Sequence, residues 1–226
     1  MSIRELIQWK PTPFQRQMYG IHPDFHINPT WHAVSLSGTK EERTEVYTHM
    51  EDFVADPQIA RRLNETFHPP VKAFRDRPPL RIVPDAKSTI TGSDERYGGY
   101  IFKMPTTSLF FVLENETHPL ASVGFNQFSD GVEIRYYQGV RTDKIGESAK
   151  DFDRLGNGLE KLAALVEDYA RYEHLAYAMI LPAAENMWVH ETTFPMERAK
   201  RIYDDTADRR GYDYNPKLRR FIKTLA

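Results

Sequence analysis

The stretch that decides the fold class is "LASVGFNQFSDGVEIRYYQGV", residues 120–140. Two strand-like segments flank Asp130-Gly131, and this dipeptide favours a tight hairpin because the turn needs positive φ, which glycine tolerates. Side chains of the second segment should alternate between two faces of the sheet. Val132, Ile134, Tyr136 and Val140 are expected on one face, and Glu133, Arg135 and Tyr137 on the other. The pattern predicts two antiparallel strands joined at this turn.

The segments on either side extend the hairpin into a sheet. "YIFKM" (100–104) and "LFFVL" (109–113) are strand-like, which predicts an antiparallel meander of three or four strands. A buried helical stripe follows, formed by Leu159, Leu162, Ala163, Val166, Tyr169 and Ala170. "LAYAMIL" (175–181) then has the continuous apolar pattern of a strand buried on both faces.

This order of elements implies an α/β (α+β) fold with a mixed, mainly antiparallel sheet and flanking helices. The last strand should be reached by a helical crossover. A final helix is expected from about Pro195 to Arg210, and the chain then ends in the basic "NPKLRRFIKTLA". No internal repeat or low-complexity tract interrupts this plan.

The N-terminal part of the chain has a different character. Residues 1–38 are rich in Pro, His and aromatic residues and lack a helical period, which predicts an extended arm with one short strand near 31–36. Helices are expected from Thr39 to Phe53 and again after Asp56-Pro57, where a capping carboxylate precedes proline. Residues 39–226 are expected to form a single domain.

Composition excludes several function classes. The 226 residues carry a net charge of -2, so no global field draws the protein to nucleic acid or anionic lipid. The absence of cysteine excludes disulfides, thiolate-ligated zinc and a cysteine nucleophile. No apolar run is long enough for a membrane span or a secretory signal, so we expect a cytoplasmic or other intracellular protein that is not secreted.

A glycine-containing loop precedes the predicted helix in "RLGNGLEKLAALVEDYA", residues 154–170. Unpaired N–H groups and the positive end of a helix attract phosphate, and glycine lets the backbone come close to it. The alternative is a simple turn that starts a helix, with Asn157 making a local hydrogen bond. A competing register for a phosphate loop is "VRTDKIGES" (140–148), which contains Gly146.

The order of meander, glycine loop, helix, buried strand and helix resembles the Gcn5-related N-acetyltransferase superfamily over about residues 100–215. The resemblance implies acetyl-CoA as cofactor, with its acyl-CoA site beginning at the end of a strand and its pyrophosphate on the loop. It assigns to cofactor binding Val140, Arg154, Gly156, Asn157, Gly158 and Asn186. The downstream "AKRIY" (199–203) matches the family's spacing, which implies that Tyr203 is the general acid.

Acyl transfer to an amine needs a base, an oxyanion donor and an acid for the leaving thiolate. Besides Tyr203, the sequence offers Glu133 as a base that acts directly or through water. The alternatives are that Tyr203 is a packed helix aromatic and that Glu133 is a solvated strand residue. His22, His26 and His32 lack metal-ligand spacing, so no metal site is expected.

The C-terminal region carries a cluster of cations interleaved with aromatic residues. Its cations are Arg209, Arg210, Lys217, Arg219, Arg220 and Lys223. Such a patch could contact nucleic acid or the 3′-phosphate of coenzyme A; alternatively it is a solvated helix end or a contact for an acidic partner.

Two main functional hypotheses follow. The first is an acyl-CoA-dependent N-acyltransferase that acts on an amine. The second is a non-catalytic assembly protein, for example a phage particle component, that forms a homo-oligomer or larger assembly through its N-terminal arm and basic C-terminus. A nucleic-acid-binding module is a third hypothesis that the overall charge does not favour, and no membrane partner is expected.

Overall fold

The computed structural model describes residues 2–10, 40–67, 81–85, 92–93, 102–103, 109–114, 119–139, 158–186, 189–190 and 192–225. Several predictions lie outside these ranges. They concern the strand at 31–36, the three histidines of the arm, the register at 140–148, and the residues Val140, Arg154, Gly156 and Asn157.

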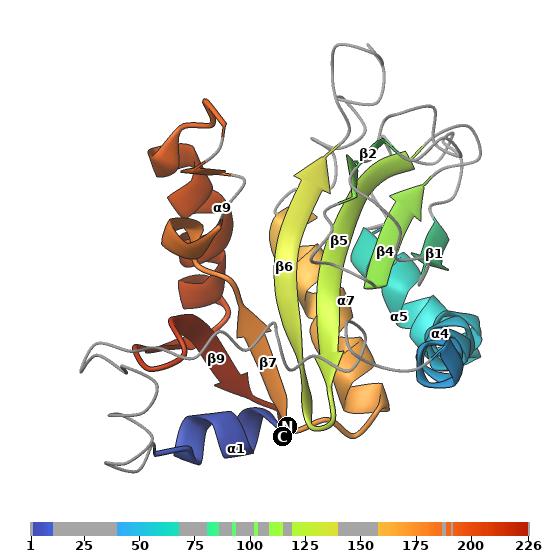
Figure 1. The fold of residues 1–226 in the computed structure, drawn as a ribbon. Coiled ribbons are helices and arrows are strands. Elements are labelled where there is room, and N and C mark those ends of the chain that lie inside the picture. Colours follow the sequence, from blue (N-terminus) through green and yellow to red (C-terminus); the bar gives the residue numbers. More distant parts are fainter. Residues whose placement is uncertain are drawn as a thin grey trace.

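A seven-stranded mixed sheet forms the centre of the protein (Figure 1). Its strands, in spatial order, are β1 (Arg81–Asp85), β4 (Leu109–Glu114), β5 (Pro119–Phe128), β6 (Gly131–Gly139), β7 (Tyr177–Ile180), β9 (Arg220–Thr224) and β8 (Asp213–Asn215). Every neighbouring pair is antiparallel except β6 and β7, which are parallel. The predicted mixed, mainly antiparallel sheet is confirmed.

Two short strands stand apart from this sheet. The strand predicted at 100–104 is β3 (Phe102–Lys103), and it pairs with β2 (Gly92–Ser93) in a separate two-stranded sheet. Its expected place in the meander is therefore wrong. The fourth strand of the meander is β1, which pairs with β4.

The helices α4 (Lys40–Ala55), α5 (Pro57–Phe67) and α7 (Gly158–Tyr172) pack together in the main core, to which α9 (Met196–Arg209) also contributes. α4 contacts β1, and α7 contacts β5 and β6. α5 begins as predicted, because the Asp56 carboxylate accepts hydrogen bonds from the N–H groups of Gln58 (2.7 Å) and Ile59 (3.3 Å). Figure 1 shows α7 behind β5 and β6, where it is the crossover between β6 and β7.

An aromatic cluster lies between these helices and the sheet. The rings of Phe53, Phe111, Phe125 and Tyr169 are fully buried, and their centroids lie 5.3–5.8 Å apart in the pairs that touch. The Tyr169 hydroxyl donates to Oε1 of Gln127 at 2.8 Å, so the one polar atom of this cluster is satisfied. The predicted helical stripe is confirmed as the buried face of α7.

A β-bulge changes the predicted alternation along β6. Phe125 lies opposite Ile134, but Gly124 lies opposite Tyr136, so Arg135 is an extra residue. Side chains beyond the bulge exchange faces. Tyr137 therefore joins Val132 and Ile134 in the main core, and the prediction that Tyr136 lies on their face is wrong. Tyr136 contacts Phe110 instead, with 5.7 Å between the ring centroids.

The basic C-terminus is a β-hairpin, which corrects the expectation of a tail. α9 (Met196–Arg209) ends as predicted, and β8 and β9 follow it. β9 pairs antiparallel with β7, with Ile180 opposite Phe221 and Tyr177 opposite Thr224. β9, the last strand in the chain, thus pairs with the edge of β7 that faces away from β6.

The first residues of the predicted extended arm form a helix instead, α1 (Ile3–Gln8). Its capping box joins Ser2 and Glu5. The Asp130 carboxylate accepts from the N–H groups of Ile3 (2.6 Å) and Arg4 (3.0 Å), which satisfies donors that a helix start leaves unpaired.

The other end and the apolar face of α1 are also held by the body of the protein. The Lys217 ammonium donates to the carbonyl oxygens of Ile7 (2.7 Å) and Trp9. The helix buries two side chains in a small cluster that consists of Ile3, Leu6, Phe128, Met179 and Leu218. The start of the N-terminal arm therefore packs on its own chain.

Candidate functional site

The candidate site lies where β6 and β7 separate. The two strands pair from Gly131 and Tyr177 to Ile134 and Ile180, and the Leu181 N–H still donates to the Ile134 carbonyl at 3.0 Å. Beyond this point β6 continues to Gly139, and Figure 1 shows it running past the end of β7. Among the strands that the structure describes, none pairs with this edge of β6 after Ile134.

Two local features explain why the strands separate here. After the last bond, the next N–H that would point toward β6 is that of Ala183, and it donates to the Asp204 carboxylate instead. Arg135 is the bulge residue of β6, and a bulge bends its strand and increases the twist. The chain after β7 turns into the short 3-10 helix η4 (Ala183–Glu185) instead of following β6.

Tyr203 lies at this separation and is almost fully buried. Its hydroxyl accepts a hydrogen bond from the Tyr137 N–H, in the part of β6 beyond its pairing with β7, and it shares a side-chain hydrogen bond with Asn186. Burial raises the pKa of Tyr203 to about 12, although both hydrogen bonds and the Arg135 charge oppose the rise. The phenol therefore keeps its proton at neutral pH and is available as a proton donor.

Asn186 and Tyr203 are two of the predicted site residues, and the fold brings them into contact. The Ala183 N–H at the start of η4 donates to the Asp204 carboxylate at 2.9 Å. Burial raises the pKa of Asp204, while this hydrogen bond opposes the rise. α9 thus holds η4 through Asp204 and Tyr203, which are adjacent in sequence.

Gly158 is the first residue of α7, so the predicted loop does end at a helix N-terminus. The first N–H groups of a helix lack intrahelical partners and carry a partial positive charge. α7 starts after β6 and lies against it, as the resemblance implies. Whether Gly158 binds a phosphate stays a prediction.

Glu133 is fully buried, so the alternative that it is a solvated strand residue is wrong. Its Oε1 accepts from Nε of Arg220 at 2.5 Å and from Nη1 of Arg135 at 3.2 Å. The Asn126 amide lies 3.4 Å from Oε2. Two guanidinium groups thus occupy Oε1 of this buried carboxylate.

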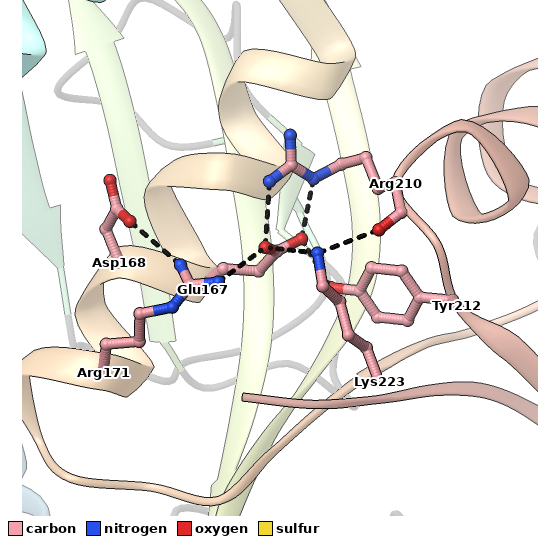
Figure 2. A network of polar contacts seen from close by, with 6 residues as sticks. All are labelled: Glu167, Asp168, Arg171, Arg210, Tyr212 and Lys223. Carbon is pink, nitrogen blue, oxygen red and sulfur yellow. Dashed lines mark hydrogen bonds and ion pairs between the residues drawn. The ribbon is translucent and has the colours of Figure 1, made fainter. Parts of the chain in front are cut away.

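A second buried carboxylate, Glu167 on α7, was not predicted (Figure 2). Arg210 binds both of its oxygens, at 2.6 and 2.8 Å. Lys223 (3.1 Å), Arg171 (3.5 Å) and the Tyr212 hydroxyl (3.0 Å) complete the network. Burial opposes the charge of Glu167, but Arg210 and Lys223 outweigh it and lower the pKa of the carboxyl.

The predicted cationic patch is paired within the protein. Arg209 pairs with Glu160, Arg210 and Lys223 with Glu167, Arg219 with Glu185, and Arg220 with Glu133. Lys217 donates to the carbonyl oxygens of Ile7 and Trp9. The interpretation of this region as a solvated helix end is wrong. No period-2 alternation marks "RRFIKT" (219–224) as a strand, since its two apolar residues are adjacent.

Two further classes of site were searched in the described ranges. No group of three His, Asp or Glu side chains there has a geometry that could hold a metal ion. No helix in the same part of the chain is long and apolar enough to cross a bilayer.

No family model matches the sequence, and no curated protein matches it. Among solved structures, a similar chain is N-acetylglutamate synthase from Neisseria gonorrhoeae, complexed with coenzyme A and N-acetyl-glutamate. The identity is 14%, the similarity covers 64% of this chain and 35% of that chain, and the TM-score is 0.31. The chain thus spans about a third of that enzyme's length.

The fold of the present chain is acetyltransferase-like. This assignment rests on its own architecture: the antiparallel meander, the α7 crossover, the parallel β6–β7 pair and the C-terminal hairpin. It agrees with the order of elements on which the predicted resemblance depends. The ligands and activity of the synthase are not transferred to this chain.

Proposed function

We propose that the protein is an acyl-CoA-dependent N-acyltransferase, with the acyl donor bound where β6 and β7 separate. The observation that carries this proposal is the position of Tyr203. A buried phenol that keeps its proton lies beside β6 beyond the point where β7 leaves it, and it is hydrogen-bonded to the N–H of Tyr137. A proton donor is therefore present where an extended ligand could bind.

The neighbouring backbone supports binding of a long polar ligand. No described strand pairs with β6 beyond Ile134 on the side of β7, and the backbone N–H and C=O groups of a strand edge can hydrogen-bond an extended chain that contains amide groups. The N-terminus of α7 at Gly158 would favour a pyrophosphate. In this proposal Val140, Arg154, Gly156 and Asn157 complete the cofactor site, as the family resemblance implies, and Asn186 acts by holding Tyr203.

Coenzyme A would supply the acyl group as an activated thioester. The chain's own contribution is to orient the donor along β6 and to hold a proton at the Tyr203 hydroxyl. Tyr203 would give its proton to the sulfur as the C–S bond breaks, and the amine that forms the new C–N bond would lose a proton to water, directly or by way of Glu133. The Tyr203 phenolate would then regain a proton from solvent. General acid catalysis of this kind contributes about 10²–10⁴-fold to a rate.

The role of Glu133 as general base stays a prediction. Its ion pairs with Arg220 and Arg135 disfavour direct proton abstraction, because both cations stabilise the ionised form. A base role would therefore act through water. The assembly hypothesis receives less support from the structure, since residues 2–10 and the C-terminal cations make their contacts within the chain.

The first test is thermal unfolding with and without acetyl-CoA. At ~100 times the dissociation constant a ligand adds about 2.7 kcal/mol of stability, which raises Tm by roughly 5–10 °C for a chain of this size. Gly158→Glu should abolish the shift because it places a negative charge at the helix start. Thr224→Glu adds the same charge at the exposed far end of β9 and should leave the shift intact. An absent shift in the wild-type protein would favour the scaffold hypothesis.

A further inference from the structure

The turn between β8 and β9 contains a residue in an unfavourable backbone conformation. Arg219 has φ of 51°, in the left-handed region that favours glycine. The Asn215 side chain shapes the turn by accepting from the N–H groups of Lys217 and Leu218, both at 3.1 Å. Glycine at position 219 would satisfy the same geometry without backbone strain, so the arginine side chain requires an explanation.

The Arg219 side chain forms an ion pair with Glu185, the last residue of η4. The Glu185 side chain is 15% exposed and that of Arg219 is 40% exposed, so the pair lies at the surface with its carboxylate partly shielded from water. Asn186 comes next in the chain and shares its hydrogen bond with Tyr203. One strained residue is therefore linked, through a single ion pair, to the segment that carries the partner of the proposed acid.

η4 is held from two directions. On one side α9 contacts it, through the Asp204 carboxylate and the Tyr203 hydroxyl. On the other side the hairpin contacts it through Arg219. The following residues also hold η4: His190 Nε2 lies 2.8 Å from the Ala184 carbonyl oxygen, and the Val189 N–H donates to the Asn186 carbonyl at 3.0 Å. These bonds fix the backbone, so loss of the Arg219 contact would act on the side chains of Glu185 and Asn186, within a 3-10 helix that has little stability of its own.

We infer that Arg219 and Glu185 are a positioning pair for the proposed acyl-transfer reaction, and that they hold Asn186 against Tyr203. This inference rests on the proposed function. Neither residue touches the reacting atoms; their contribution is to fix the hydrogen bond that orients the phenol. The strain at Arg219 is retained because the side chain, not the turn, is needed there.

The test distinguishes the effect of losing the Arg219 ion pair from the effect of relieving backbone strain at position 219. Arg219→Gly relieves the backbone but removes the ion pair, so Tm should stay within a few degrees of wild type or rise. The kcat should fall about 10-fold while KM for acetyl-CoA changes less than about twofold, because misorientation of a catalytic group acts on the chemical step. Arg219→Lys keeps the charge and should retain most of kcat.

His174 provides a matched control. It also has a positive φ, 56°, but it lies at the exposed end of α7. His174→Gly relieves the same kind of strain and should change neither kcat nor KM. The double variant Arg219→Glu with Glu185→Arg re-forms the ion pair with reversed charges and should restore kcat. If Arg219→Gly fails to fold, the double variant compared with Arg219→Glu alone tests the same inference.

A readout that is independent of catalysis is the ¹³Cζ NMR resonance of Tyr203, assigned by its loss in Tyr203→Phe. This resonance reports the hydrogen bonding of the phenol, so it should shift in Arg219→Gly and return in the double variant. An unchanged resonance, or a wild-type kcat in Arg219→Gly, would overturn the inference. Failure of the wild-type protein to bind or turn over acetyl-CoA would instead overturn the proposed function, and the NMR comparison would still decide whether the pair positions Tyr203.

Discussion

Replacing Glu167 by glutamine preserves the shape of the side chain but removes the charge that Arg210, Lys223 and Arg171 share. Removing one partner of a buried ion pair costs about 3–5 kcal/mol, because the remaining charge is left uncompensated. Arg210 and Lys223 are 22% and 23% exposed, so water screens them partly. We therefore expect a loss near the lower end, about 3 kcal/mol.

A loss of ~3 kcal/mol corresponds to a decrease in Tm of roughly 6–12 °C for a chain of this size. The measurement is thermal unfolding by circular dichroism at pH 7. Glu197→Gln is the matched control, because its carboxylate is 80% exposed and pairs only at the surface with Lys200. The control should change stability by less than about 0.5 kcal/mol.

The pH dependence gives a second check on Glu167. The pKa of its carboxyl is lowered in the folded protein from the ordinary value of 4.5. A lowered folded pKa contributes stability that is fully present above pH 4.5 and is lost as the pH falls through the folded value. The difference in Tm between wild type and Glu167→Gln should therefore shrink below pH 4.5. A difference below about 2 °C at pH 7, or one that grows on acidification, would refute the reasoning.

Two further predictions concern Tyr203, the proposed general acid, and the packing of α1. Tyr203→Phe should lower kcat by about 10²-fold in an assay of thiol release from acetyl-CoA, and an unchanged kcat would remove Tyr203 from the mechanism. The wild-type rate should show no decline from loss of this acid up to pH 10, because a pKa of about 12 keeps the phenol protonated. Gly131→Ala should cost about 1–3 kcal/mol, because a Cβ there would lie 2.6 Å from the Tyr177 carbonyl oxygen and collide with Ile3. Hydrogen exchange at the amides of α1 should then accelerate, and unchanged protection would contradict the packing described for Gly131.

Local patterns in the sequence predicted a large part of the fold. The hairpin at Asp130-Gly131, the start of α5 after Asp56 and the buried stripe of α7 all depend on residues close together in the chain. The helix α1 was missed although its signal was present, since Ser2 and Glu5 have the spacing of a capping box. Its six residues are too few to show a helical period.

The candidate site was predicted only in part. The match at 199–203 identified Tyr203, and Asn186 was named as well, but their mutual hydrogen bond depends on how η4 packs against α9. The bulge at Arg135 was not visible, because an extra residue in one strand is defined only by the strand that pairs with it. The separation of β6 from β7 follows from that bulge and from the turn of the chain into η4, where the Ala183 N–H donates to Asp204.

The sequence by itself determined the central hairpin, the crossover helix, the start of α5 and the mixed character of the sheet, because turn chemistry, capping and hydrophobic period act over a few residues. Only the tertiary structure decided which carboxylates the C-terminal cations pair with. Arg220 meets Glu133 across 87 positions of the chain, and Lys223 meets Glu167 across 56. A cation far from its partner in sequence has the pattern of a solvated side chain, and only the packing of β9 beside β7 buries it against a carboxylate.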